Sequence, residues 1–428
     1  MEGPRPKRQR KVTQPDPSGC RRQVHYSPPY QAATEEEKQN WKGFCEIESD
    51  PAFFSSMLRD FGVKGVKVTE VLGLDEDMLQ LLPQPIYGLI FLFQYQGVDA
   101  GEQEDTAPNH VWFATQGAAN MCATVALLNI VNNIPDAELG PELRDFKAQT
   151  MGMTPIERGR WLESFRHIKN VHNSFARKID MLNIDLHAKQ QADVAAAAAK
   201  KPRGRGGKGR KAVAEEAAFH FVAYVPIENE IWRLDGLDTQ PQKFGSHEGQ
   251  NWLKVIAPVL AARMNEFTDG ELEFTLLALV KDPLDSIREA LTANMRHLRT
   301  IEARLDSCSS SWKDFTPWTD PDESRSFRGP DEAIGITEAM VVACRSPSVP
   351  EYTATDTQAS LLEGRMTVIA EQKSLRAQLR DEMFSRNQDD QKTVDRKAEY
   401  GPFIQGWLMA LAENGVLQQL TKKYSTKK

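Results

Sequence analysis

Apolar residues recur at regular spacing over 41–283, and their pattern predicts alternating helices and strands. The segment that follows Asp50 predicts a helix, with Asp50 as its cap and Pro51 in its first turn. Residues 86–96 are apolar on both faces, as in a central buried strand. Residues 120–133 are apolar on almost every face, which favours a helix inside the core. We therefore expect a folded domain with a buried central strand and a helix that passes through its core.

The pattern is interrupted once within this region. Residues 187–217 hold a polyalanine tract followed by a run rich in Gly, Lys and Arg, and strand-like sequence resumes at 219–227 and 230–236. Because strands continue after the break, we interpret it as an insertion within one domain. The remaining predicted elements are helices at 139–150, 154–175 and 249–265, a strand at 271–282, and helices at 284–306 and 361–386.

These elements divide the chain into five parts. Residues 1–39 are basic and Pro-rich, and we expect them to be disordered because they cannot bury enough apolar surface to offset their ordering entropy. The two helices beyond the first domain sustain no heptad, which favours a helical hairpin over a long coiled coil. The other expected parts are a folded domain (40–283) with an insertion at about 178–217, a helix (284–306), a Ser/Pro/Asp-rich linker (307–358), and a helical region (359–428) that ends in an amphipathic tail at about 400–423.

Charge is distributed unevenly along the chain. The 60 acidic and 53 basic residues give a net charge of −7, yet residues 4–12 hold five basic side chains and residues 200–211 hold seven, with no acid in either segment. The rest of the chain therefore carries 41 basic against 60 acidic residues, a net charge of −19. Net charge of this kind acts through the steering of partners.

Cysteine spacing and apolar run length argue against several protein classes. The five cysteines show no CxxC or Cys/His ligand spacing, so we expect no disulfide framework, no structural zinc and a reducing compartment. No apolar run reaches the roughly 18 residues of a transmembrane helix, and the basic N-terminal segment does not have the apolar stretch of a signal peptide. We expect a soluble intracellular protein with no membrane partner, no metal and no organic cofactor.

Four residues form one candidate site. Cys122 falls at the start of a predicted helix, where backbone N–H groups and the helix dipole favour the nucleophilic thiolate. His220 lies in a predicted strand and could act as the base of a cysteine–histidine pair, while Asp235, at the end of the next strand, could hold the imidazole in its reactive tautomer. Gln116 could donate its amide to an oxyanion together with the backbone N–H of Cys122.

Each of these residues alone also has an ordinary structural interpretation. A cysteine on an apolar helix is more often a small core residue. A histidine flanked by Phe on a strand could be a buried structural residue, and an Asp-Gly pair after a strand is first of all a turn. Spacing alone does not decide between these alternatives.

Six sequence blocks occur in order over residues 40–283. They are GFCEIESDPAFFSSMLRDFGVKGVKVTEV, LPQPIYGLIFLFQYQ, HVWFATQGAANMCATVALLNIVNN, HNSFAR, AFHFVAYVPIENEIWRLDGL and DGELEFTLLALVKD. The chain thereby resembles the ubiquitin carboxyl-terminal hydrolase family of cysteine deubiquitinases. The resemblance implies an α/β (α+β) fold with a papain-like core, an antiparallel sheet between helices, a backbone threaded as a knot, and a helical C-terminal extension. It places the family's oxyanion glutamine, nucleophile, histidine and aspartate on Gln116, Cys122, His220 and Asp235.

The resemblance implies thiol-dependent hydrolysis of the bond after the C-terminal glycine of ubiquitin, through an acyl-enzyme that water then hydrolyses. The implied partners are ubiquitin and ubiquitinated proteins, and the acidic body suits the Arg-bearing tail of ubiquitin. The alternative is an autoinhibited or weakly active ubiquitin-binding adaptor or scaffold on the proteasome or on chromatin. The other cysteines are not expected to be catalytic; they are Cys20, Cys45, Cys308 and Cys344.

In this family the insertion is a loop that crosses the active site and limits which leaving groups can pass. Its length here implies tolerance of bulky ubiquitin conjugates. Three interpretations of its basic part stay open: a solvated spacer, a nuclear localisation signal alone or with residues 4–11, and direct DNA or nucleosome contact through arginines in the minor groove. We expect a protein of the nucleus and cytoplasm. The basic residues are Lys200, Lys201, Arg203, Arg205, Lys208, Arg210 and Lys211.

Residues 400–423 resemble the C-terminal tail of the larger family members, which docks on a helical deubiquitinase-adaptor domain of a partner. One subgroup binds a ubiquitin receptor of the proteasome, and the other binds a Polycomb-type adaptor and removes ubiquitin from a core histone. Chain length favours the first subgroup and the basic insertion favours the second. The alternative is a helix that packs back on the catalytic domain. The apolar residues at helical spacing are Phe403, Ile404, Trp407, Leu408 and Leu411.

Overall fold

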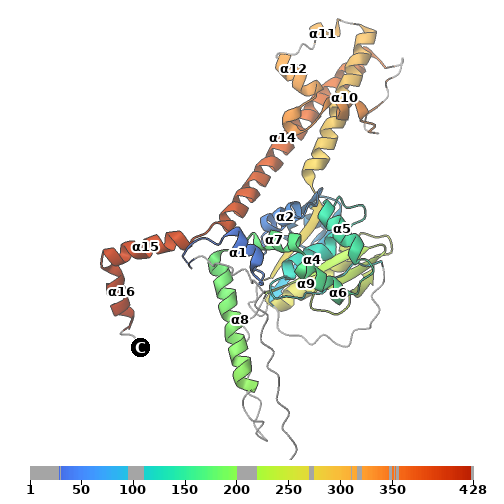
Figure 1. Cartoon of the computed structure of the whole chain (residues 1–428). Helices are drawn as coiled ribbons and strands as arrows, with labels where there is room; N and C mark the ends of the chain where they lie inside the picture. Colours follow the sequence, from blue (N-terminus) through green and yellow to red (C-terminus); the bar gives the residue numbers. More distant parts are fainter. Residues whose placement is uncertain are drawn as a thin grey trace, which may run out of the picture.

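The computed structural model describes residues 28, 30–94, 110–199, 219–268, 274–309, 311–315, 321–346, 349–350, 352 and 356–425. Within them, a six-stranded sheet lies among helices and a pair of long helices rises from it (Figure 1). The expected antiparallel sheet between helices, followed by a helical C-terminal region, is confirmed. The knotted threading of the backbone stays a prediction. No helix in the described ranges is both long and apolar enough to cross a membrane.

The sheet has the strand order β1-β6-β2-β3-β4-β5, and every neighbouring pair is antiparallel. Strand β2 lies in its interior, and Leu89, Ile90 and Phe91 are fully buried there, as expected for a strand that is apolar on both faces. The strands are β1 (Val66–Glu70), β2 (Ile86–Gln94), β3 (Phe219–Ile227), β4 (Glu230–Asp235), β5 (Gln242–Ser246) and β6 (Phe274–Lys281).

Helices cover both faces of the sheet. Helix α4 (Cys122–Val131) packs on one face, mainly against β3, and α9 (Trp252–Thr268) packs on the other. Every residue of α4 except Cys122 is buried, which explains why its sequence is apolar all round. The exception is half-buried and stands at the first position of the helix.

Sequence signals at helix starts are reproduced in the structure. Asp50 caps α2 (Pro51–Asp60) by accepting a 3.0 Å hydrogen bond from the N–H of Ala52, with Pro51 in the first turn. The expected helix over 154–175 is divided at Phe165, whose backbone is extended. The other short helices of this domain are α3 (Glu76–Gln80), α5 (Pro141–Thr150), α6 (Pro155–Ser164) and α7 (Arg166–Asn173).

The segment before residue 40 departs from the expected disorder where the structure describes it. Residues Glu35–Asn40 form α1, which begins with a capping box between Thr34 and Glu37. The carboxylate of Glu37 is buried and accepts a 2.6 Å hydrogen bond from the equally buried ammonium of Lys178. Residues 1–27 and 29 lie outside the described residues, so disorder there stays a prediction.

The insertion begins as a helix, not as the expected loop. Helix α8 (Lys178–Ala199) starts at the buried Lys178 and runs through the polyalanine tract, because alanine has the highest helix propensity. It extends away from the sheet and the helices that cover it (Figure 1). The seven basic residues at 200–211 lie outside the described residues, and their three interpretations stay open.

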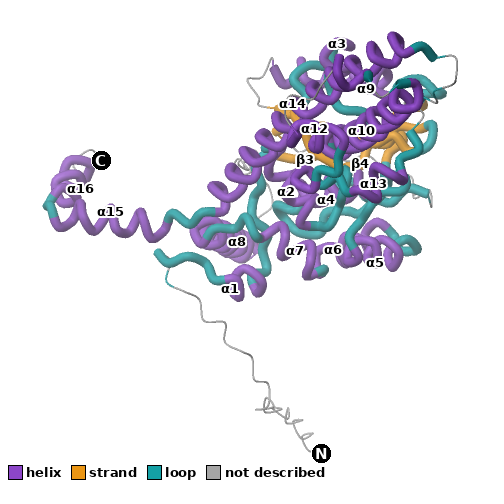
Figure 2. Tube along the Cα trace, turned by 90° about the horizontal axis from the view of Figure 1, so that it is seen from above, coloured by secondary structure: helices purple, strands orange, loops and turns teal. Residues whose placement is uncertain are grey.

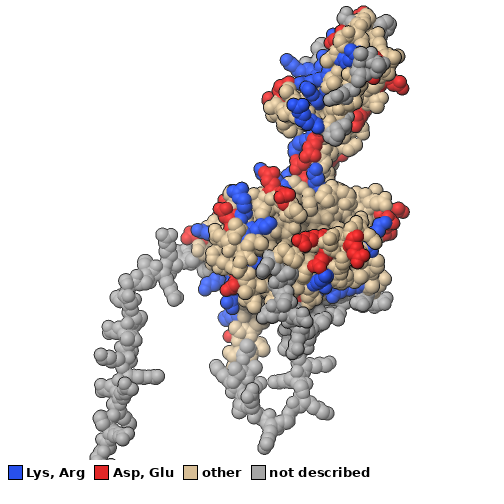
Figure 3. All heavy atoms as spheres, turned by 90° about the vertical axis from the view of Figure 1, so that its right-hand side faces the viewer, with Lys and Arg blue, Asp and Glu red and all other residues tan. Residues whose placement is uncertain are grey.

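Two long helices form an arm beside the domain. Helices α10 (Pro283–Cys308) and α14 (Gln358–Lys397) pack against each other, which confirms the expected helical hairpin (Figures 1 and 2). The expected linker carries short helices, because Trp312, Phe327 and Val341 bury their side chains against the hairpin. Basic side chains gather along this arm on the face shown in Figure 3. The short elements are α11 (Trp312–Phe315), α12 (Pro321–Arg328), η1 (Glu332–Ile334) and α13 (Glu338–Ala343).

Helix α14 is longer than the expected 361–386, and its second half returns to the domain that contains the sheet, where it packs along α2. The tail then leaves as α15 (Gly401–Glu413) and α16 (Val416–Ser425), which project away from the other described elements (Figure 2). The ion pairs that hold α14 to the domain are Lys67–Glu382, Arg59–Asp390, Lys392–Asp50 and Arg396–Glu48.

Candidate active site

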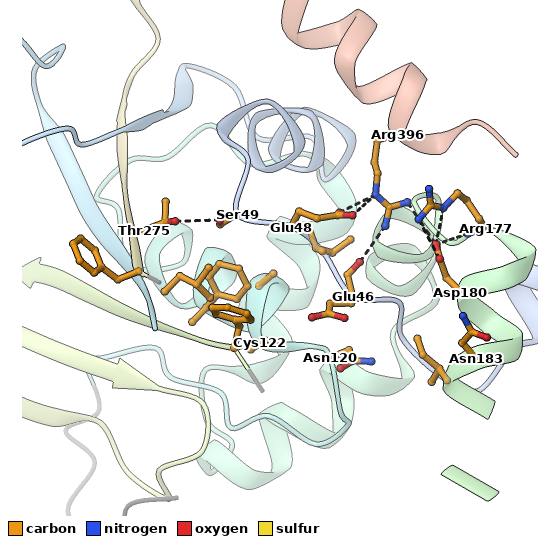
Figure 4. Close-up of a pocket in the computed structure, with 17 residues that line it drawn as sticks. Glu46, Glu48, Ser49, Asn120, Cys122, Arg177, Asp180, Asn183, Thr275 and Arg396 are labelled. Carbon is orange, nitrogen blue, oxygen red and sulfur yellow. Dashed lines mark hydrogen bonds and ion pairs between the residues drawn. The ribbon is translucent and has the colours of Figure 1, made fainter. Parts of the chain in front are cut away.

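Cys122 stands at the mouth of a cleft. It is the first residue of α4, at the positive end of the helix dipole, and Met121 before it makes no side-chain capping bond to the first-turn N–H groups. The side chain is half-buried and lines a cavity of about 550 Å³ (Figure 4). The thiol is therefore accessible to a substrate that enters the cleft.

His220 and Asp235 form a buried pair beside this cysteine. Strands β3 and β4 are paired so that Val222 lies opposite Asp235. His220 is two residues before Val222 on the same face of β3, so its ring reaches the carboxylate of Asp235. The Nε2 of His220 and the Oδ1 of Asp235 are 2.6 Å apart. Burial disfavours the charged ring, but hydrogen bonds to Asp235 and to Cys122 outweigh it and raise the pKa of His220 to about 9.

Further bonds hold the Asp235 carboxylate. Its Oδ1 also accepts the backbone N–H of Leu237 at 3.0 Å, and its Oδ2 accepts Nη2 of Arg233 at 2.5 Å. Burial alone would raise the pKa of Asp235, yet its bonds to His220 and Leu237 and the charge of Arg233 lower it. The carboxylate is therefore ionised at neutral pH and both of its oxygens are fixed.

Gln116 lies on the loop that leads into α4, close to the turn after Asp235. Its backbone N–H donates to the carbonyl of Gly236 at 2.7 Å, and a Cβ on Gly236 would approach Cβ of Gln116 to 3.2 Å. The side-chain Nε2 donates to the carbonyl of Ala118 at 3.0 Å. Its Oε1 is buried without a hydrogen-bond partner among the described residues. The second amide hydrogen of Nε2 has no acceptor among the described residues.

The far wall of the cleft includes residues that the sequence analysis did not select as site residues. The loop 46–48, the start of α8 and the end of α14 meet there (Figure 4). Arg396 of α14 donates its Nε–H to both carboxylate oxygens of Glu48, at 2.6 and 2.8 Å, and lies 3.5 Å from Asp180. Asp180 also accepts Nε of Arg177 at 2.9 Å. No local pattern marks Arg396, because its partner Glu48 is 348 positions away in the chain.

Other histidines and cysteines near the core have structural surroundings. His172 is fully buried, with Nδ1 2.7 Å from Oγ1 of Thr124 and Nε2 2.7 Å from the carbonyl of Cys45, and burial lowers its pKa to about 4. Burial raises the pKa of Cys45 to about 12, so its thiol is not activated. Cys308 and Cys344 lie on the helical arm, and Cys20 is outside the described residues.

The remaining predicted residues lie away from the cleft. Phe403, Ile404, Trp407 and Leu408 are exposed on α15, and Leu411 is half-exposed. Across the described ranges, no group of three or more His, Cys, Asp or Glu side chains is placed to hold a metal ion. The structure thus brings Cys122, His220, Asp235 and Gln116 together and leaves the tail residues as a separate surface.

Comparisons with known proteins show the family of this chain. The model of the family "Ubiquitin carboxyl-terminal hydrolase, family 1" matches residues 44–265. The chain is 35% identical over 251 residues to ubiquitin carboxyl-terminal hydrolase ubh-4 of Caenorhabditis elegans, covering 58% of this chain and 70% of that protein. It is 34% identical over 258 residues to ubiquitin carboxyl-terminal hydrolase BAP1 of Xenopus tropicalis, covering 56% and 34%.

Among solved structures, the catalytic domain of Trichinella spiralis UCH37 bound to ubiquitin vinyl methyl ester shares 30% identity with this chain. The match has a TM-score of 0.43 and covers 56% of this chain and 96% of that one. The family model spans more than half of the chain and contains all four residues of the candidate site. The chain belongs to family 1 of the ubiquitin carboxyl-terminal hydrolases, the cysteine peptidases that act as deubiquitinases.

Proposed function

We propose that this deubiquitinase cleaves the bond after the C-terminal glycine of ubiquitin with Cys122 as the nucleophile. His220 gives a proton to the departing amine as general acid and later takes one from water as general base, Asp235 orients the imidazole, and Gln116 is the oxyanion donor. The observation that carries the proposal is the contact of Cys122 with a buried His–Asp pair at the mouth of a cleft.

In the first half of the reaction, the thiolate of Cys122 attacks the carbonyl carbon of the terminal glycine. Because the pKa of His220 is about 9, its ring is protonated at neutral pH and supports the thiolate. The oxyanion that forms lies near the N–H groups at the start of α4 and the amide of Gln116. His220 then gives its proton to the departing amine, the C–N bond breaks, and a thioester remains.

In the second half, a water molecule replaces the amine. His220, now neutral, takes a proton from this water as it attacks the thioester carbonyl, and the sulfur leaves as thiolate. Asp235 keeps the same ring nitrogen bonded through both halves, since its Oδ1 lies 2.6 Å from Nε2. The other ring nitrogen therefore faces Cys122 throughout.

The cleft suits an extended peptide with basic side chains. Its apolar part includes Leu92 and Phe221, and the carboxylates of Glu48 and Asp180 on its far wall are already ion-paired with arginines. Glu46 is exposed and offers a carboxylate on this wall. The Arg-bearing tail of ubiquitin would run from this wall toward Cys122, in keeping with the acidic body of the chain.

A ubiquitin with an electrophilic C-terminus, such as its vinyl methyl ester, tests this assignment. We expect one adduct, on Cys122, because this is the cysteine that combines a helix start, exposure and a histidine partner. Peptide mapping by mass spectrometry identifies the labelled residue. Cys344 is the matched control, since it is also half-buried but lies on the arm. An adduct on another cysteine, or none with the folded chain, would contradict the proposal.

The tail supports a second function, the binding of an adaptor. In α15 no residue is buried, and Phe403 and Trp407 are 73% and 57% exposed. Apolar exposure of this extent along one helix is typical of a docking surface for a partner helix. We propose that a helical deubiquitinase-adaptor domain, of the proteasomal or the Polycomb type, binds there. We propose that the enzyme acts in the nucleus and the cytoplasm, which is consistent with an adaptor of either type.

The base of the tail is joined to the segments beside the active site. Oε1 of Glu399 accepts the backbone N–H groups of Ala33 at 3.0 Å and of Lys178 at 2.9 Å, so it touches the first residue of α8. The guanidinium of Arg177 lies over the ring of Tyr400 at 5.7 Å. An adaptor that turns α15 would therefore strain the start of α8 and the far wall of the cleft, which supports regulation of the enzyme through the tail.

We expect the double substitution Phe403→Ala and Trp407→Ala to weaken adaptor binding at least about 30-fold, because exposed aromatic anchors dominate such interfaces. Isothermal titration calorimetry with the two types of adaptor domain measures the loss. Met366→Ala, which removes an equally exposed apolar side chain from α14, is the control. Glu399→Gln should leave adaptor binding intact and reduce the adaptor's effect on kcat/KM. An unchanged affinity of the double variant would rule out this surface.

A further inference from the structure

Arg233 is bonded to the carboxylate oxygen of Asp235 that His220 does not use. It lies two residues before Asp235 on β4, and side chains at this spacing share one face of a strand. Its Nη2 donates to Oδ2 of Asp235 at 2.5 Å, while Oδ1 is occupied by His220 and by the N–H of Leu237. The two carboxylate oxygens thus have separate partners.

The guanidinium is itself fixed from the opposite side. Its Nη1 donates to Oδ2 of Asp238 at 3.1 Å and to Oε1 of Gln242 at 3.0 Å. Asp238 lies just after the turn at the end of β4 and is buried, whereas Gln242 lies opposite Arg233 on β5. A planar guanidinium held at two nitrogens sets the direction of its remaining donors.

This bonding pattern restricts rotation of the Asp235 carboxylate. A carboxylate held only by the imidazole could turn about its side-chain bonds and carry the ring with it. Here Arg233 bonds one carboxylate oxygen, and the other oxygen is directed at Nε2 of His220. The second ring nitrogen of His220 then faces Cys122. Such second-layer partners orient a reactive group without touching the substrate.

We propose that Arg233 is a positioning residue for the reaction, acting through Asp235 on His220. The proposal rests on the roles assigned above to these two residues. Arg233 also weakens the attraction between the Asp235 carboxylate and the imidazolium of His220, because its positive charge lies beside that carboxylate. Arg233 thus lowers the pKa of His220 somewhat while it fixes the orientation of the imidazole ring.

The pH dependence of kcat/KM separates this role from a purely structural one. In the unsubstituted enzyme, His220 loses its proton as the pH rises through about 9, so activity should fall above that pH. In Arg233→Gln, we expect this alkaline limb to move to higher pH, because the unopposed carboxylate stabilises the imidazolium more. The value of kcat/KM at neutral pH should fall about tenfold. A structural role would lower activity without moving the limb.

Two further variants complete the test. Arg233→Lys keeps the positive charge but loses the planar set of guanidinium donors. The alkaline limb of its pH profile should therefore stay in place while kcat/KM falls. Arg263→Gln is the matched control, since Arg263 is another half-buried arginine at the sheet, bonded to Tyr224 and not to Asp235, and its limb should not move. Thermal unfolding of each variant reports any loss of stability.

A double-substitution cycle tests the route through Asp235. In an Asp235→Asn background, Arg233→Gln should change kcat/KM less than about twofold, because the carboxylate through which it acts is gone. If the losses in kcat/KM of the two single variants multiplied in the double variant, the proposal would be overturned. An unchanged alkaline limb in Arg233→Gln would overturn it as well. A wrong catalytic assignment would show up in a different experiment, as turnover that is retained by the Cys122→Ala variant.

Discussion

Cys122→Ala should abolish cleavage of a C-terminal amide of ubiquitin, with a loss of at least about 10⁴-fold in kcat/KM. The expected loss is this large because no other cysteine in the described residues combines a helix start with a histidine partner. Cys45, the other cysteine of the catalytic domain, is buried and its pKa is raised to about 12. Turnover of a fluorogenic ubiquitin amide measures the effect.

Binding of ubiquitin should survive the same substitution. Cys122 contributes only one half-buried side chain to the cleft, while the far wall and the apolar lining remain. Calorimetric titration with ubiquitin separates a lost reaction from a lost fold. Cys344→Ala, on the helical arm, is the matched control and should leave turnover unchanged. Retained turnover in Cys122→Ala would contradict the assignment of the nucleophile.

His220→Ala should be as inactive as the loss of the cysteine, and Asp235→Asn should cost less than either. Without the imidazole there is neither a partner for the thiolate nor a proton for the leaving amine. Asn at 235 keeps an oxygen near Nε2 of His220 but removes the charge, so the ring is oriented less well rather than lost. A loss about 10²-fold smaller than that of His220→Ala is expected.

Steady-state rates of the two variants with the same fluorogenic substrate test this order. Unfolding temperatures provide the control, because a buried His–Asp pair also contributes to stability. His172→Ala is a useful comparison: this histidine is buried and bonded to Thr124, so its loss should lower stability more than it lowers the reactivity of the site. If Asp235→Asn were the more damaging change, the proposed roles would be wrong.

The parts of the fold that follow local rules were predictable. Asp50 and Pro51 marked the start of α2, and the apolar runs marked β2 and α4, since capping and burial on all faces leave a local signature. The site residues came from family blocks that the family model confirms over 44–265. Their meeting in space depends on the pairing of β3 with β4, which alternation alone does not determine.

The far wall of the cleft was not predictable for a physical reason. Arg396 bonds Glu48 across 348 positions, and neither residue differs in its local pattern from any surface charge. The helix α8 was missed although its signal was present, because the polyalanine tract was interpreted as part of a loop when alanine favours a helix. Arg233 was also within reach, since it shares a strand face with Asp235.

Glu399 has a consequence for how the protein is made. It bonds Ala33 and the first residue of α8, and the bond to Ala33 joins positions 366 apart in the chain. These contacts can form only after the ribosome has synthesised nearly all of the residues that the structure describes. Until then Arg396 is also absent, and the far wall of the cleft has no guanidinium between Glu48 and Asp180. A nascent chain therefore completes its active-site cleft last, after the sheet and α4 have already emerged.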